Sequence, residues 1–260
     1  MTSRSPARSP RPRLVVVHGL LGSIAGLELE RYLPDVDLYH PDLTGYGRHR
    51  DERQGIDLAS QARALERMLR DEIGEPVWLL GHSTGGVIAM LVADAVPELV
   101  RGLIDVEGNF TLKDAFWCSR IAPQLDADWA AEYGAMEDAP GAWLEGIGIE
   151  ASDERVGWTR AMLANQPYTT VQELARSVLD VTGAPDYLDT VRRVLERGTP
   201  VWLVGGEQSA AGWDVPDWVM ADACGIRIQP KAGHMMMLDD PRAFCAIVGD
   251  ILQESGDDAG

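Results

Sequence analysis

Short runs of consecutive apolar residues recur along the chain, and each run ends at glycine or polar residues. A strand that is buried on both faces, as strands of a parallel sheet are, shows such a run instead of an alternating pattern. The clearest runs occupy residues 14–17, 77–80, 103–106 and 201–204, and shorter ones occupy 36–40 and 225–228. The pattern predicts a mostly parallel sheet of about six strands.

Helical patterns separate these runs. In residues 57–73 the apolar positions recur every three or four residues and Gly74 follows, which is typical of an amphipathic helix and its end. Residues 87–96 are apolar almost throughout, and residues 241–252 begin with proline, which is common at the first helical position. Strands that alternate with helices predict an α/β fold with a doubly wound sheet.

The segment 109–198 interrupts this alternation, because it contains no clear buried strand. Its aromatic side chains are Phe110, Phe116, Trp117, Trp129, Tyr133, Trp143, Trp158, Tyr168 and Tyr187. We predict that this segment is a helical cap inserted into a core formed by residues 14–108 and 199–260. Most of these aromatic side chains are expected to form the interior of the cap, and two or three to line an apolar pocket.

Charge and cysteine content limit the partners, the metal sites and the cellular location that we expect. Residues 1–13 contain four arginines and no acid, and they lack the apolar segment of a secretory signal, so they predict a disordered tail. The net charge of −18 argues against nucleic acid and anionic membranes as partners. The chain has three cysteines, Cys118, Cys224 and Cys245, which lie far apart. We therefore expect reduced thiols, no metal site and a cytoplasmic location.

Residues 81–85, Gly-His-Ser-Thr-Gly, lie directly between a predicted buried strand and a predicted helix. A nucleophile at such a sharp turn has a strained backbone, and its neighbours must be small because larger side chains would collide with the adjacent elements. The turn raises the hydroxyl above the sheet and points the helix N-terminus at the reacting carbon. This context predicts Ser83 as a nucleophile.

A second glycine-rich turn, His-Gly-Leu-Leu-Gly at residues 18–22, follows the first predicted strand. Its glycines would let the Leu20 N–H face the serine. With the Thr84 N–H, that group would form an oxyanion hole of two donors. We expect His18 to have a structural role in this loop.

A serine hydroxyl is a poor nucleophile and needs a base. His234 follows the last predicted strand and comes after the serine in the chain, which is the order found in hydrolases with this type of turn. His40 and His49 precede the serine. His82 adjoins the serine and is expected to point away from its hydroxyl. His234 is therefore the predicted general base.

Several motifs together resemble the α/β-hydrolase superfamily. They are residues 18–19 (His-Gly), 42–47 (Asp-Leu-Thr-Gly-Tyr-Gly), 81–86 (Gly-His-Ser-Thr-Gly-Gly) and 233–234 (Gly-His). The resemblance implies a nucleophile–acid–histidine triad, an oxyanion hole, often a cap, and no metal or organic cofactor. Haloalkane dehalogenases and epoxide hydrolases of this fold use an aspartate at the turn, so Ser83 argues against both.

The N-terminal part of the chain departs from the family pattern. The antiparallel hairpin that usually precedes the first strand is absent before residues 14–17. We therefore expect a reduced sheet of about six parallel strands in place of the eight strands usual in the family.

The position of the catalytic acid also departs from the family. Where the family commonly has an aspartate after the strand at 201–204, this chain has Ser209, which cannot carry the charge that stabilises an imidazolium. We predict that Glu107, at the end of the preceding strand, replaces it, as in some lactonases and dehalogenases of the family. Glu207 and Asp214 stay open as alternatives.

These residues predict a serine hydrolase acting on a carboxylic ester, lactone or thioester through an acyl-enzyme. Ser83 would attack the carbonyl carbon, and His234 would take and return the proton. Glu107 would orient His234, and the Leu20 and Thr84 N–H groups would bind the oxyanion. The same triad serves carbon–carbon bond hydrolysis, and acyl transfer or cyclisation in biosynthesis. A hydrolase-fold binding protein with little turnover is the alternative that the missing aspartate favours. We expect a small, largely apolar acyl substrate, and the sequence leaves a homodimer open.

Overall fold

The computed structural model describes residues 11–257 and contains a six-stranded sheet in the order β2-β1-β3-β4-β5-β6. Neighbouring strands are parallel throughout this sheet. The strands are β1 (Arg13–Val17), β2 (Asp37–Tyr39), β3 (Val77–His82), β4 (Val100–Val106), β5 (Val201–Gly206) and β6 (Gly225–Gln229). The sheet is built outward from β1 in both directions, so the predicted doubly wound α/β fold is confirmed.

The start of β1 corrects the predicted boundary of the tail. The prediction placed residues 1–13 in a disordered tail, but Arg13 is the first residue of β1. Its backbone pairs with Asp37 of β2, and its guanidinium forms an ion pair with Glu75. Residues 1–10 of the predicted tail lie outside the described residues.

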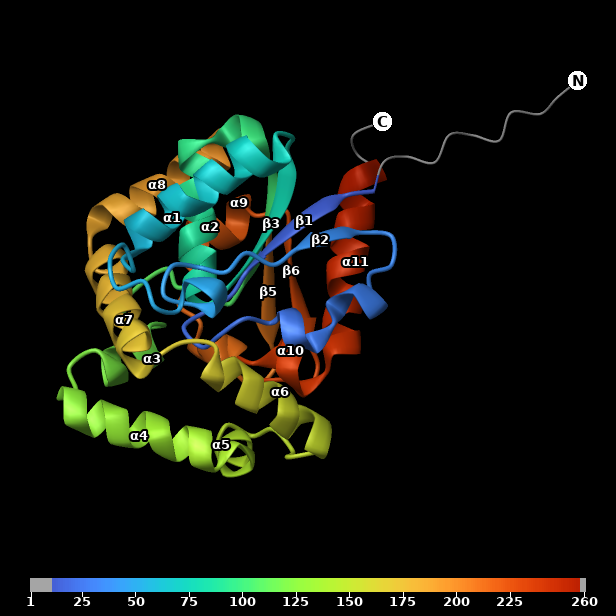
Figure 1. The fold of residues 1–260 in the computed structure, drawn as a ribbon. Helices are drawn as coiled ribbons and strands as arrows, with labels where there is room; N and C mark the ends of the chain where they lie inside the picture. The colour runs from blue at the N-terminus through green and yellow to red at the C-terminus, as the bar shows by residue number, and fades with distance from the viewer. Residues whose placement is uncertain (1–10, 258–260) are drawn as a thin grey trace, which may run out of the picture.

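Helices cover both faces of the sheet (Figure 1). On one side α2 (Thr84–Ala95) packs between α1 (Leu58–Met68) and α8 (Pro185–Glu196), and α9 (Asp217–Asp222) contacts α8. On the opposite side α11 (Pro241–Asp257) contacts β6 and the short helix α10 (Met236–Asp239). Among the helices of residues 11–257, none combines the length and the apolar character that crossing a bilayer requires.

Six helices connect β4 to β5. Besides α8 they are α3 (Phe116–Ile121), α4 (Asp126–Asp138), α5 (Pro140–Gly146), α6 (Asp153–Ala164) and α7 (Tyr168–Thr182). Helices α4 and α5 lie beyond the carboxyl ends of the strands, whereas α8 lies beside α2 against the sheet (Figure 1). The predicted cap boundaries, residues 109–198, therefore stay a prediction, because α4 and α5 lie over the ends of the strands whereas α8 packs against α2.

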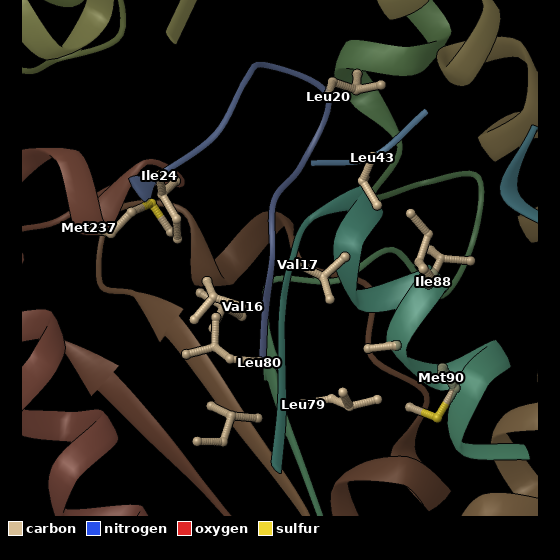
Figure 2. Packing of buried hydrophobic residues seen from close by; sticks show 14 of the residues in the cluster. Val16, Val17, Leu20, Ile24, Leu43, Leu79, Leu80, Ile88, Met90 and Met237 are labelled. Carbon is tan, nitrogen blue, oxygen red and sulfur yellow. The ribbon is translucent and has the colours of Figure 1, made fainter. Parts of the chain in front are cut away.

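The core lies between the sheet and its flanking helices (Figure 2). Every residue of β3 is buried, and so are most residues of α2, including Ile88 and Met90. Both elements have neighbours on all sides, which accounts for their largely apolar sequences. This packing holds the carboxyl ends of β1 and β3, where Val17 leads into the loop at 18–22 and His82 leads into Ser83.

Candidate active site

Ser83 occupies a strained turn between β3 and α2. Its φ of 54° and ψ of −122° lie outside the regions that residues with a side chain ordinarily adopt. A side chain at either flanking glycine would collide with backbone. A Cβ on Gly81 would lie 2.4 Å from the Gly85 oxygen, and a Cβ on Gly85 would lie 2.2 Å from the Val17 oxygen. The two glycines of the motif are thus required by packing, and they permit a turn that presents the serine.

A small cleft of about 20 Å³ contains the predicted nucleophile and base. Ser83 and His234 both line it, together with Gly19, Leu20, Leu21, His82, Trp117 and Met235. Thr84 is fully buried and begins α2. Leu20 thus lies at the same cleft as Ser83, and Thr84 directly follows the serine; the oxyanion hole formed by their N–H groups stays a prediction.

The loop that carries Leu20 is fixed by a tyrosine of the motif at residues 42–47. The buried Tyr46 hydroxyl donates a hydrogen bond to the Leu20 carbonyl at 2.9 Å. The His18 ring packs against the Tyr46 ring with their centroids 4.5 Å apart, and His18 Nδ1 lies 2.8 Å from the Gly19 oxygen. The resemblance alone pointed to this motif, and the structure supplies its physical role.

The structure brings Glu107 and His234 together across 127 positions of sequence. His234 Nδ1 lies 2.6 Å from Glu107 Oε2. The other carboxylate oxygen, Oε1, accepts hydrogen bonds from the Gly206 N–H at 2.8 Å and from the Ser209 hydroxyl at 2.5 Å. Ser209, which lacks the charge of the family's aspartate, thus donates to the glutamate.

The Glu107 side chain is buried, with 4% of its surface exposed, and its negative charge is stabilised by its neighbours. Burial raises the pKa of this carboxyl. The hydrogen bond and charge of His234, followed by the bonds from Ser209 and Gly206, outweigh burial and leave the pKa below its ordinary value. A carboxylate held in this state fixes the orientation of the imidazole.

The alternative acids Glu207 and Asp214 make their hydrogen bonds elsewhere, and so does Asp105, a third acid, which lies in β4 two residues before Glu107. Glu207 accepts from the Lys231 backbone N–H at 2.7 Å. Asp214 accepts from the Thr111 hydroxyl, also at 2.7 Å. Asp105 accepts from the Gly108 N–H at 2.7 Å, and burial raises its pKa to about 7. Geometry therefore favours Glu107 over all three as the partner of His234.

His82 has a role that the sequence did not reveal. A carbonyl oxygen can only accept, so His82 Nε2 donates to the backbone oxygen of His234, which lies 3.0 Å away. The centroids of the two rings are 4.8 Å apart. Burial, followed by the charge of His234, lowers the pKa of His82 to about 3, so His82 stays neutral and holds the loop of the predicted base.

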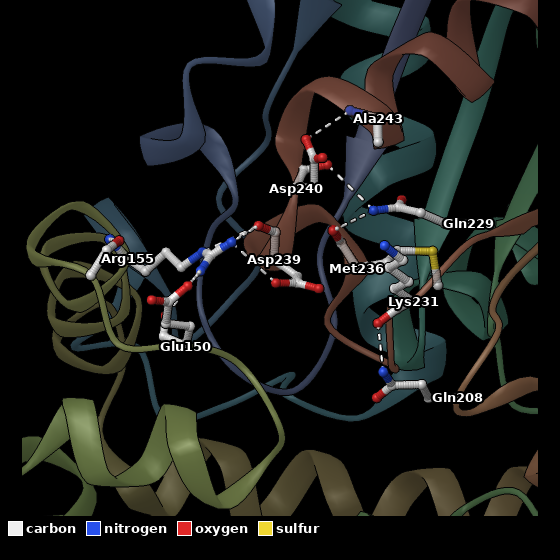
Figure 3. A network of polar contacts seen from close by, with 10 residues as sticks. Glu150, Arg155, Gln208, Gln229, Lys231, Met236, Asp239, Asp240 and Ala243 are labelled. Atoms are coloured by element: carbon white, nitrogen blue, oxygen red, sulfur yellow. Dashed lines mark hydrogen bonds and ion pairs between the residues drawn. The ribbon is translucent and has the colours of Figure 1, made fainter.

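The segment that follows His234 is held by a polar network (Figure 3). Gln229 Nε2, from β6, donates to the Met236 oxygen at 3.1 Å. From the other side Arg155 of α6 donates to the Asp239 oxygen at 2.6 Å and forms an ion pair with the Asp239 carboxylate. These contacts tie α10 both to the sheet and to α6.

The buried histidines predict how stability depends on pH. Burial lowers the pKa of His18 to about 4, below the ordinary value of about 6.5 in an unfolded chain. As the pH falls below about 6.5, the unfolded chain therefore binds protons that the folded chain does not, and stability decreases. His18→Asn should reduce the loss of unfolding free energy between pH 7 and pH 5 by about 1–2 kcal/mol, as measured by urea denaturation. Equal losses in both proteins would contradict this expectation.

Comparison with known proteins identifies the family. A model of the "Alpha/beta hydrolase family" matches residues 14–247. The chain belongs to the alpha/beta hydrolase family. It is an enzyme of the hydrolase class, and its six parallel strands form the core of the family fold.

Two relatives in sequence and one solved structure of similar fold serve as examples of similar proteins. The lipase LipV of Mycobacterium tuberculosis is 28% identical over 259 residues, which cover 91% of each chain. The pimeloyl-[acyl-carrier protein] methyl ester esterase of Yersinia pseudotuberculosis is 37% identical over 105 residues, which cover 39% of each chain. A haloalkane dehalogenase loop variant from Bradyrhizobium elkanii is 20% identical, with a TM-score of 0.70 over 97% of this chain and 92% of that chain.

Proposed function

We propose that this hydrolase cleaves carboxylic esters, with Ser83 as nucleophile, His234 as general base and Glu107 as the acid that orients the histidine. The observation that carries the proposal is the 2.6 Å contact between Glu107 and His234 at a cleft that Ser83 also lines. The Glu107 carboxylate holds the proton on Nδ1, which leaves Nε2 free to accept the serine proton.

The reaction follows from these positions. Ser83 Oγ attacks the ester carbonyl carbon while His234 Nε2 takes its proton, and the oxygen of the tetrahedral intermediate accepts hydrogen bonds from the Leu20 and Thr84 N–H groups. His234 then gives the proton to the leaving alcohol, and an acyl-enzyme forms. A water molecule, deprotonated by His234, attacks the acyl carbon and releases the acid and Ser83.

The names of the two sequence relatives support an ester substrate. One is a lipase and the other a methyl ester esterase, so both act on bonds of this type. The likeness to the dehalogenase extends to the fold only and does not bear on the reaction. The partner that we propose is a small, largely apolar ester.

Turnover of simple esters tests this function. The purified protein should release 4-nitrophenol from 4-nitrophenyl esters. The His234→Gln variant, which lacks the base, should be slower by about three orders of magnitude. Asp214→Asn is the matched control, because this acid binds Thr111 away from the cleft, and it should retain the wild-type rate. Equal rates in wild type and His234→Gln would contradict the proposal.

A further inference from the structure

A second, larger cavity lies beside the catalytic cleft. Its volume is about 360 Å³, within the range of small-molecule pockets and far above the ~20 Å³ of the cleft. The loop at 23–27, the helix α6 and residues 235–238 form most of its wall, and Asp42, Gly47 and Asn165 complete it. The side chains of Ile24, Leu27, Met162, Met237 and Leu238 give it apolar walls.

Met235 separates the cleft from this cavity. It lines both spaces and is 7% exposed. A methionine side chain has no branch and rotates readily, so a change of rotamer can join the two spaces without moving the backbone. Met235 directly follows His234, and the wall therefore stands next to the reacting atoms.

The walls of the cavity are fixed relative to one another. Ile24 and Met237 lie side by side at the junction of the loop and α10 (Figure 2). Arg155 ties α6 to Asp239 (Figure 3). A Cβ on Gly22 would lie 2.3 Å from the Met162 oxygen, so the loop packs directly on α6. A cavity held from three sides in this way is formed before a ligand enters.

The position of the cavity favours the acyl side of an ester. The leaving oxygen must contact His234 to receive its proton, and Phe116, which is 49% exposed, packs edge-on against that ring. The leaving group therefore points towards solvent beside Phe116. Leu20, whose N–H we propose binds the carbonyl oxygen, belongs to the same loop that continues into the cavity wall at 23–27.

We propose that this cavity binds the saturated acyl chain of the substrate and that Met235 is a specificity-determining residue between the chain and the reacting carbonyl. This inference rests on the proposed ester hydrolysis and adds its substrate class, esters of medium-chain fatty acids. Burial of each further methylene should raise kcat/KM about fourfold until the cavity is full.

A pair of matched substitutions tests the proposal. Ala161 and Ala142 are both exposed alanines of helices in the segment between β4 and β5. Ala161 lines this cavity, and Ala142 lines a separate hollow of about 450 Å³. Ala161→Phe fills the cavity and should lower the ratio of kcat/KM for 4-nitrophenyl octanoate to that for the acetate by at least about tenfold. Ala142→Phe should leave this ratio at its wild-type value.

Two outcomes would overturn the proposal. One is an unchanged ratio in Ala161→Phe, and the other is a lowered ratio in Ala142→Phe alone, which would place the chain in the other hollow. If Ala161→Phe does not fold, Gly26→Phe serves in its place, because Gly26 lines the same cavity and a Cβ there meets nothing within 4 Å. The octanoate-to-acetate ratio of kcat/KM is then measured for Gly26→Phe. An unchanged ratio in this variant, or a lowered ratio in Ala142→Phe alone, would again overturn the proposal.

Binding of octanoate separates this inference from the proposed function. Calorimetry on Ser83→Ala, which cannot turn over, should show octanoate binding that Ala161→Phe abolishes in the same background. Binding of this kind in a protein that hydrolyses no ester would reject the proposed function and retain the cavity assignment. Ester hydrolysis without any such binding would reject the cavity assignment alone.

Discussion

Replacement of Ser83 by alanine should lower kcat/KM for a simple ester by at least about three orders of magnitude. The hydroxyl is the atom that bonds to the acyl carbon, and no other serine or cysteine side chain lines the cleft among the described residues. Alanine keeps the strained φ of 54°, so the variant should unfold at nearly the same denaturant concentration as the wild type. Rates are measured with 4-nitrophenyl acetate, and stability with urea.

Ser83→Gly provides a matched control for the strain. Glycine adopts a positive φ at little cost, so this variant should be as inactive as Ser83→Ala and more stable by about 1 kcal/mol. Activity within about tenfold of the wild type in either variant would contradict the assignment of the nucleophile.

Glu107→Gln should lower kcat by about two to four orders of magnitude. The substitution keeps the size of the side chain, and its oxygen can still accept from Gly206 and Ser209. The negative charge beside His234 Nδ1 is lost, so the imidazolium formed during attack is no longer offset, and the wrong tautomer is favoured. Steady-state kinetics on the folded variant measures the effect, and near-normal activity would reject Glu107 as the acid.

A second substitution tests whether the two strand ends are interchangeable. The Ser209 hydroxyl lies 2.5 Å from the Glu107 carboxylate, so an aspartate at position 209 places a charge close to the same histidine. Adding Ser209→Asp to Glu107→Gln should restore part of the lost kcat, because the family's usual acid position is then filled. An inactive double mutant would leave Glu107 as the acid and reject the equivalence of the two positions.

The parts of this fold that could be predicted are those that depend on local sequence. The buried strands consist mostly of consecutive apolar residues, and the turn at Ser83 needs small neighbours on both sides, so both leave a short-range signal. The segment 109–198 was predicted to be a helical cap because it contains no clear buried strand and is rich in aromatic residues. Its pattern did not reveal that α8 packs against α2, because an apolar stripe does not specify the partner that covers it.

The site contacts that escaped prediction join residues distant in sequence. Because Ser209 stands where the family commonly has an aspartate, the sequence pointed to Glu107 as the acid. Nothing in the sequence showed that the Ser209 hydroxyl itself donates to that carboxylate. In the same way, the hydrogen bond from His82 to the His234 carbonyl joins residues 152 positions apart. The hydrogen bond from Tyr46 to the Leu20 carbonyl joins residues 26 positions apart. Contacts of this kind depend on the folded sheet, which brings the carboxyl ends of parallel strands to one edge.

The most direct test of the central claim is to locate the covalent adduct formed with a fluorophosphonate, which reacts with an activated serine. Mass spectrometry of the digested protein should find the adduct on Ser83. Labelling should be much slower in the Glu107→Gln and His234→Gln variants, because both lack part of the activating system. An adduct on another serine, or no adduct at concentrations that label other serine hydrolases, would contradict the account.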